Sequence, residues 1–321
     1  MGLMISMKNS LQNRSLNFRA MGTDVSIEIA DLCGLDADSC RKNVFKIVRE
    51  IFAENEKIFS RFQKDSELSK INNSVGKEIA VSEKMFEVLE LCLKFNKISN
   101  GYFDPRIIKN LEIIGYDKDF GINDLNSTES REIELEKFET DLREDLILNL
   151  EHKTVLVKKR IDTTGIAKGY TVDEAARYLK KQNFENFVVD AGGDMYAYGK
   201  DSENQRWRIG VEGMDDNRIM LSLDNEGIAT SGISRKRWRI GEKKVHHLIN
   251  PKDPEKFSYD IKTVTVIEEK TVEADGRAKV LVLMGREKGL EFADENNIKA
   301  LFLDYRGNVY LSKAIRENIV E

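Results

Sequence analysis

Two glycine-rich segments in the middle of the chain most restrict how it can fold. The first is Ile161-Asp-Thr-Thr-Gly-Ile-Ala-Lys-Gly-Tyr170, and the second, Asp190-Ala-Gly-Gly-Asp194, follows after one predicted helix and one predicted strand. Glycine lets the backbone come close to a ligand, and a helix start offers free N–H groups to phosphate oxygens. The neighbouring acids could hold a metal, a ribose or an adenine amine. The glycine spacing differs from the dinucleotide fingerprint and from the P-loop, so we predict a different kind of nucleotide site.

The order of the predicted elements favours the α+β class. Apolar residues at helical spacing predict helices over residues 38–59, 82–100, 167–181, 272–284 and 288–295. Shorter apolar or alternating runs predict strands over residues 17–29, 146–150, 154–157, 187–190, 207–211, 219–223, 227–231, 237–240, 262–267, 298–303 and 309–311. Strands follow one another in meanders rather than in strict βαβ alternation. We therefore expect mainly antiparallel sheets flanked by helices.

The chain shows no clear internal boundary, and we expect a single domain over residues 17–315 made of two interlocked lobes, after a tail of residues 1–16. Residues 60–73 are polar and predict a loop. Residues 117–145 are highly charged and poor in aromatic side chains. This composition predicts a partly helical surface excursion, with no catalytic or binding role.

Charge and cysteine content exclude several classes of protein. The chain has 51 Lys and Arg against 56 Asp and Glu, with no basic stripe, so we expect no nucleic-acid partner. Its three cysteines, Cys33, Cys40 and Cys92, form no CxxC pair, which argues against a zinc site or a disulfide framework. No stretch approaches the roughly 18 apolar residues of a membrane span, and no signal-peptide pattern begins the chain. We expect a cytoplasmic protein without stable membrane insertion.

Several short blocks, taken in chain order, resemble the ApbE family of flavin transferases, which are FAD:protein FMN transferases. The resemblance runs from Met21 to about Gly285. Besides the segment from Asp162 to Tyr170 with Asp173, its blocks are Met21-Gly-Thr, Ser60-Arg-Phe, Asp65-Ser-Glu-Leu-Ser69, Gly101-Tyr-Phe-Asp-Pro105, Gly192-Gly-Asp194, Ala229-Thr-Ser-Gly232, His247-Leu-Ile-Asn-Pro251 and Ala274-Asp275.

The resemblance implies a two-lobed, T-fold-like domain that binds FAD and Mg²⁺ between its lobes. It implies transfer of the FMN half of FAD to a Thr or Ser hydroxyl of a target protein, with release of AMP. By resemblance, His247 is the catalytic base. The FAD-binding positions that it implies are Met21, Phe62, Ile113, Ile114, Gly115, Asp162, Lys168, Gly192, Gly193, Asp194, Thr230, Ser231, Leu248 and Ile249.

The metal positions that the resemblance implies are the backbone near Gly165, the side chain of Asp275 and the residue four positions later. The family has a threonine at that last position, and this chain has Lys279. Asp275 and Lys279 are spaced to share a helix face. Two interpretations of Lys279 stay open: an ordinary salt bridge, or an ammonium where the metal or its ligand would be.

Two alternatives to flavin transfer also remain. The first is an FAD pyrophosphatase that uses the same site with water as acceptor and gives FMN and AMP. The second is a non-catalytic FAD-binding protein with a degenerate metal site. Lys279, and Asn250 in place of the aspartate that the family prefers, keep this second alternative open.

Overall fold

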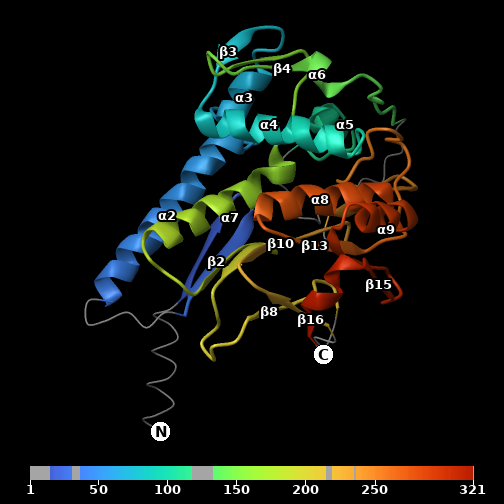
Figure 1. Cartoon of the computed structure of the whole chain (residues 1–321). Helices are drawn as coiled ribbons and strands as arrows, with labels where there is room; N and C mark the ends of the chain where they lie inside the picture. Colours follow the sequence, from blue (N-terminus) through green and yellow to red (C-terminus); the bar gives the residue numbers. More distant parts are fainter. Residues whose placement is uncertain (1–14, 31–36, 118–132, 215–218, 235, 321) are drawn as a thin grey trace.

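The structure is a computed structural model of the chain that describes residues 15–30, 37–117, 133–214, 219–234 and 236–320 (Figure 1). Most of the expected tail, Cys33 and residues 118–132 of the expected excursion lie outside these ranges, and the side chains of residues 37–41, Cys40 included, are not described either.

An eight-stranded sheet forms the centre of the described chain, and each of its strands runs antiparallel to its neighbours. The predicted α+β class with mainly antiparallel strands is therefore confirmed. In spatial order the strands are β1 (Ser15–Ala20), β2 (Thr23–Ile29), β6 (Phe187–Ala191), β7 (Asp194–Tyr198), β10 (Glu226–Gly232), β13 (Thr263–Glu268), β14 (Lys299–Leu303) and β15 (Val309–Leu311).

Both faces of this sheet are covered, because side chains alternate along each strand. In β6, Phe187 and Val189 pack against helices, whereas Val188 packs on the opposite face. Figure 1 shows the helices of the first face crossing the sheet, and these are α2 (Ala37–Phe59), α7 (Thr164–Lys181), α8 (Thr271–Met284) and α9 (Arg286–Glu295). The second face packs against β8 (Trp207–Gly210), β9 (Met220–Leu223), β16 (Ile319–Val320) and η4 (Ala314–Asn318).

Two smaller parts complete the described chain. The first, which contains Phe86 and Phe95, consists of α3 (Glu67–Asn72), α4 (Glu83–Ile98), α6 (Leu142–Asp145) and the sheet of β3 (Glu78–Ala80), β5 (Thr154–Val157) and β4 (Leu146–Asn149). The second is a separate core around Trp238, where residues 133–135 pack against η1 (Pro105–Ile107), α5 (Ile108–Ile113) and the hairpin of β11 (Arg237–Ile240) and β12 (Lys243–His246).

Helices α7 and α8 cross closely because α7 has a glycine at the crossing. A Cβ atom on Gly169 would lie 2.8 Å from the backbone of Thr271 and Val272. Farther along α8, Gly276 lies against the ring of Phe95, since a Cβ there would lie 2.4 Å from the ring. These contacts fix α8 relative to α7 and α4, and α8 carries two of the predicted site residues.

The structure corrects three sequence-based predictions. Residues 17–29 form a hairpin rather than one strand, because Met21 and Gly22 adopt positive φ angles of 51° and 71° in a two-residue turn. The predicted loop 60–73 contains helix α3, which Ser66 caps by accepting from the Ser69 amide. The described part of the charged excursion is not all at the surface, since Ile133, Leu135 and Leu142 are buried.

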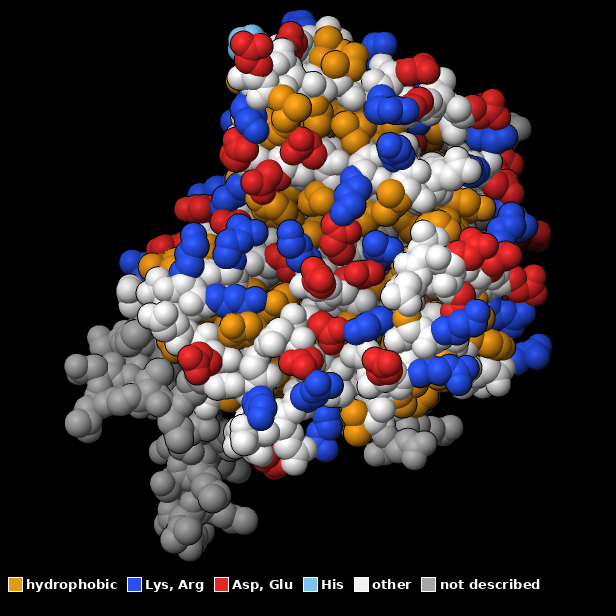
Figure 2. Space-filling model, viewed as in Figure 1, with side chains coloured by type: hydrophobic (Ala, Val, Ile, Leu, Met, Phe, Trp, Pro, Cys, Tyr) orange, Lys and Arg blue, Asp and Glu red, His pale blue; other side chains and the backbone are white. Residues whose placement is uncertain are grey.

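The outer surface is mixed in charge where Figure 2 shows it. Lys and Arg alternate with Asp and Glu over the helices on this face, and neither sign forms a continuous patch there. Within the described residues, none of the helices combines the length and the apolar character that a membrane-spanning helix needs.

Candidate active site

A cavity of about 730 Å³ lies where the predicted blocks meet. Its walls come from the β1–β2 turn, the end of α2, the first turns of α7, the end of β10, the segment after β12, and α8. Ligand pockets commonly measure ~300–1,000 Å³. The described cavity is therefore large enough for a dinucleotide-sized ligand, and it draws its walls from segments far apart in the sequence.

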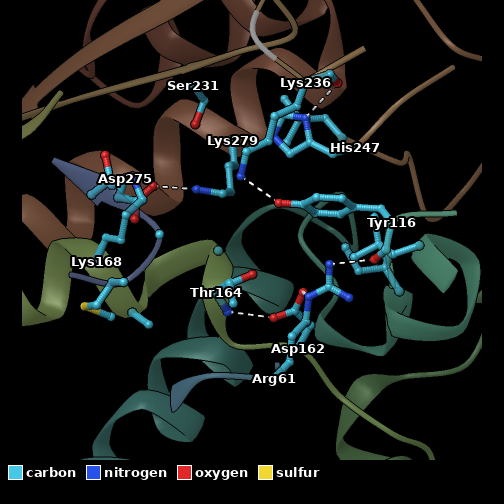
Figure 3. A pocket seen from close by; sticks show the side chains of 18 of the residues that line it. Arg61, Tyr116, Asp162, Thr164, Lys168, Ser231, Lys236, His247, Asp275 and Lys279 are labelled. Atoms are coloured by element: carbon cyan, nitrogen blue, oxygen red, sulfur yellow. Dashed lines mark hydrogen bonds and ion pairs between the residues drawn. The ribbon is translucent and has the colours of Figure 1, made fainter. Parts of the chain in front are cut away.

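Two lysines and two aspartates form a charged cluster in one wall and directly behind it. We call it the Lys–Asp cluster, and its members are Lys168, Asp194, Asp275 and Lys279. Lys168 on α7 binds Asp194 at the start of β7. Lys279 Nζ lies 2.5 Å from Asp275 Oδ1, one turn earlier on α8 (Figure 3). Burial and the charge of Asp275 raise the pKa of Asp194. Burial opposes the charge on Lys168, but Asp194 and Asp275 hold its pKa above the usual value. The four groups together are neutral when each is ionised.

A second ion pair, between Arg61 and Asp162, supports the start of helix α7. Arg61 Nε lies 3.3 Å from Asp162 Oδ2, and both side chains are less than 5% exposed, at 3% and 4%. Asp162 Oδ1 also accepts the backbone N–H of Thr164 at 2.8 Å. Farther back, the side-chain amide of Asn72 donates to and accepts from the backbone of Ile161, at 2.8 Å each. The irregular segment that leads into α7 is therefore held by Asn72 at Ile161 and by Arg61 at Asp162.

The guanidinium of Arg61 also organises two aromatic rings of the cavity. Its carbon lies 4.3 Å from the ring centre of Phe62 and 4.7 Å from that of Tyr116. Arg61 Nη2 donates to the Tyr116 carbonyl at 2.8 Å, which holds the backbone as well as the ring. Phe62, by resemblance a FAD-binding position, is thus fixed by an arginine that sequence reasoning did not select.

His247 lies beside Tyr116 at the opposite wall, directly after strand β12. Its Nδ1 is 3.3 Å from the carbonyl oxygen of Lys236. The rings of His247 and Tyr116 meet edge to face, with their centres 6.1 Å apart. The Lys236 ammonium donates to the Tyr116 hydroxyl at 2.6 Å (Figure 3). A carbonyl can only accept, so the bond assigns the imidazole proton to Nδ1 and leaves Nε2 as an acceptor. Burial and then the charge of Lys236 lower the pKa of His247 well below its usual value. A neutral imidazole can act as a base.

The neighbouring His246 has a structural role. Its Nε2 donates to the Ser258 carbonyl at 3.1 Å, and its ring lies 5.2 Å from the rings of both Phe257 and Tyr259. Burial lowers the pKa of His246 to about 4.

Most of the residues that the resemblance selects lie together. The cavity wall includes Met21, Phe62, Asp162, Gly165, Lys168, Gly192, Thr230, Ser231, His247, Leu248, Ile249, Asp275 and Lys279. Five others are not part of this wall: Ile113, Ile114, Gly115, Gly193 and Asp194. Asp194 acts behind the wall by binding Lys168, and the Ile114 carbonyl accepts from the Trp238 indole at 2.8 Å.

Gly192 gives space to the protein itself rather than to a ligand. A Cβ atom there would lie 2.0 Å from Thr23 Oγ1, and both Gly192 and Gly193 have positive φ angles, of 67° and 97°. The β6–β7 turn therefore packs directly on the β1–β2 hairpin, next to the cavity.

The cavity wall also contains side chains that sequence reasoning did not select as site residues. The most important are Arg61, Tyr116 and Lys236, and others are Arg19, Tyr102, Phe103, Thr164, Glu212 and Arg237. Arg61 had a signal, since it stands between Ser60 and Phe62 in a block that carries the resemblance. Lys236 and Arg237 stand in a short basic run, Arg235-Lys-Arg237, which by sequence is typical of a solvated strand edge rather than of a phosphate contact. Tyr116 had no signal, because its position depends on contacts between distant segments.

The residues of the implied metal position do not fit Mg²⁺. This ion prefers several oxygen ligands, and an ammonium has no acceptor to offer. Lys279 occupies one oxygen of Asp275 and lies against Gly165, where a Cβ would meet the lysine Cδ at 3.4 Å. In the part of the chain that the structure describes, no group of three or more His, Cys, Asp or Glu residues could hold a metal ion.

A family model described as the ApbE family matches residues 21–302 of this chain. Among curated relatives, FAD:protein FMN transferase of Haemophilus influenzae is 28% identical over 314 residues, covering 94% of this chain and 89% of the relative. The protein of the same description from Vibrio cholerae is 27% identical, covering 88% and 85%.

Solved structures give the same result for the fold. The flavin transferase ApbE from Vibrio cholerae superposes with a TM-score of 0.76 at 25% identity, covering 95% of this chain and 98% of that one. An ApbE protein from Thermotoga maritima gives a TM-score of 0.80 at 22% identity, covering 96% and 99%.

Proposed function

Since this chain belongs to the ApbE family, we propose that it transfers the FMN half of FAD to a hydroxyl group of an acceptor protein and releases AMP. The observation that carries the proposal is the cavity itself. It combines a neutral imidazole, a cationic wall and aromatic rings in a space of about 730 Å³.

The reaction is a phosphoryl-type substitution on FAD. The acceptor oxygen forms a bond to the phosphorus on the flavin side of the pyrophosphate. The bond from that phosphorus to the bridging oxygen breaks, and this oxygen leaves with AMP. Such reactions depend on the position of the nucleophile and on stabilisation of the phosphate charge.

We propose that His247 takes the acceptor's proton. Its Nδ1 is held by the Lys236 carbonyl, so Nε2 is the atom that accepts. Its lowered pKa keeps the imidazole neutral at pH 7, which a general base requires. We propose that the acceptor is a Thr or Ser side chain, because a hydroxyl needs this help to become a nucleophile.

Other residues of the cavity hold FAD. The rings of Phe62 and Tyr116, fixed by Arg61, offer faces on which a flavin or adenine ring can stack. Lys168 and Lys279 offer positive charge to the phosphate oxygens. No step in this mechanism passes through a metal, because the residues at the implied position do not fit one.

The test uses purified protein, FAD and purified candidate acceptor proteins. We expect flavin fluorescence that stays with the acceptor in a denaturing gel, and one AMP for each flavin attached. An acceptor in which the modified Thr or Ser is replaced by Ala should receive no flavin. Release of FMN and AMP at the same rate without any acceptor would instead identify an FAD pyrophosphatase.

A further inference from the structure

The Lys–Asp cluster provides a cation of its own at the place where the implied metal would lie. Asp275 is 1% exposed, while Lys279 has a side chain that is 18% exposed and lines the cavity. Behind them, Lys168 and Asp194 form the same kind of pair, with side chains 29% and 2% exposed. In each pair the acid is buried and the lysine faces the cavity.

Lys279 also contacts the first turn of helix α7. Its Cδ and Cε would lie 3.4 and 3.5 Å from a Cβ on Gly165, the second residue of that helix. The stem of Lys279 therefore runs past a helix start, where phosphate oxygens are favourably placed, and its ammonium ends at the buried carboxylate of Asp275.

The arrangement of charges in the cluster favours an anion over a divalent cation, because the lysines are more exposed to the cavity than the acids. With Lys168 and Lys279 paired to Asp194 and Asp275, the four groups sum to zero. A divalent cation at the other oxygen of Asp275 would be repelled by Lys279 at short range. A pyrophosphate, in contrast, gains an ammonium donor that is already oriented.

We propose that the Lys279 ammonium, oriented by Asp275, contacts the pyrophosphate of FAD in place of a divalent metal, so that FAD binding and flavin transfer need no divalent cation. This inference rests on the proposed function for the identity of the ligand. Oδ2 of Asp275 has no hydrogen-bond partner within the described protein. The Asp275 carboxylate is therefore held through its other oxygen, Oδ1, by Lys279.

The experiment measures FAD affinity by calorimetry in EDTA and then in excess Mg²⁺. We expect the wild-type protein to bind FAD with the same affinity in both, within about twofold. In Lys279→Thr we expect a loss of roughly tenfold or more in EDTA, as for a lost charge-assisted hydrogen bond. Mg²⁺ should restore part of this affinity, because threonine supplies an oxygen beside Asp275.

Two further variants make the result specific. Lys279→Met keeps most of the length of the side chain without charge or oxygen, so its loss of affinity should not be restored by Mg²⁺. Lys288→Thr removes an exposed lysine of α9 outside the cavity wall and should bind FAD like the wild type. Wild-type binding that EDTA abolishes and Mg²⁺ restores would overturn the inference, and so would an unchanged affinity in Lys279→Thr.

AMP release with FAD and acceptor, measured in the same two buffers, separates this inference from the proposed function. Equal rates in EDTA and in Mg²⁺ support the inference. Release only in Mg²⁺ contradicts it and leaves flavin transfer intact. A protein that binds no FAD in either buffer contradicts both.

Discussion

The carboxylate of Asp173 on α7 caps the start of α8, where its Oδ1 accepts the backbone N–H of Thr271 at 2.8 Å. Its Oδ2 accepts the next amide, that of Val272, at 3.0 Å. The motif from Asp162 to Asp173 thus serves two purposes. Its early residues line the cavity, and its last acid positions the helix that carries Asp275 and Lys279.

Removal of this cap should destabilise the fold. For Asp173→Ala we expect the free energy of unfolding to fall by about 1–2 kcal/mol, the usual cost of a lost N-cap. Asp173→Asn keeps one acceptor oxygen and should lose less. Urea denaturation of the three proteins checks this order. If Asp173→Ala were as stable as the wild type, Asp173 would have no capping role.

The catalytic assignment of His247 predicts a separation of binding from rate. In His247→Ala, flavin transfer should fall by about 10²–10⁴-fold, the usual contribution of a general base. FAD affinity should stay within about tenfold, since a base acts on the acceptor. His152→Ala, at an exposed position in the β4–β5 turn, is the control. Transfer at the wild-type rate in His247→Ala would remove this residue from the mechanism.

The buried pair of Arg61 and Asp162 predicts a large loss of stability when one partner is removed. In Arg61→Met the Asp162 charge remains buried without its partner, so we expect a loss of about 3–5 kcal/mol in unfolding free energy. The double variant Arg61→Met with Asp162→Asn removes both charges and should recover part of the loss. If the loss of unfolding free energy in the double variant equalled the sum of the losses in Arg61→Met and in Asp162→Asn, the two residues would not be coupled.

The buried His246 predicts that stability falls in acid. The pKa of His246 is about 4 when folded, against roughly 6.5 in an unfolded chain, so between these values the unfolded state binds more protons. Stability should therefore decrease as the pH falls through this window, by roughly 2–3 kcal/mol from this residue between pH 7 and 4.5. In His246→Gln, urea denaturation at both pH values should show a smaller decrease. An equal decrease in both proteins would exclude His246 as the cause.

The size of the cavity predicts a preference for the whole dinucleotide. FAD should bind at least about tenfold more tightly than FMN, because FMN leaves part of the aromatic and cationic wall without a partner. Calorimetry with FAD, FMN and AMP measures the difference directly. Equal affinities for FAD and FMN would show that the adenosine half makes no contact that matters.

Local signals explain which elements could be predicted from sequence. Helix α4 was predicted to begin at residue 82 because Ser82 precedes a helical pattern, and the structure shows Ser82 capping the helix by accepting from the Met85 amide at 3.2 Å. The turn at Met21 and Gly22 was missed because apolar residues alternate on both sides of it. Strands β7 and β12 were also missed, since each is short and follows a turn. Each forms a short hairpin with the strand that directly precedes it, β6 or β11.

The residues of the candidate site also divide into those that a local pattern selects and those whose role depends on distant contacts. Most of the positions that the resemblance selected line the cavity, because its blocks are local. Tyr116 escaped selection because its role comes from its contact with Arg61, which no local pattern records. Arg61 stands in the Ser60-Arg-Phe block, but its pairing with Asp162 is visible only in the structure. The replacement of threonine by Lys279 was visible in the sequence. Only the structure shows that its ammonium lies beside Asp275 and its stem against Gly165.

The distribution of the cavity wall over the chain has a consequence during synthesis. The hairpin of β1 and β2 joins the sheet through β6, and α8 supplies the Lys279 side of the cavity. A nascent chain cannot complete the site until residue 279 has left the ribosome and α8 has docked, because domains are made from the N-terminus onward. FAD binding by ribosome-bound chains of increasing length would therefore report the chain length at which α8 completes the cavity.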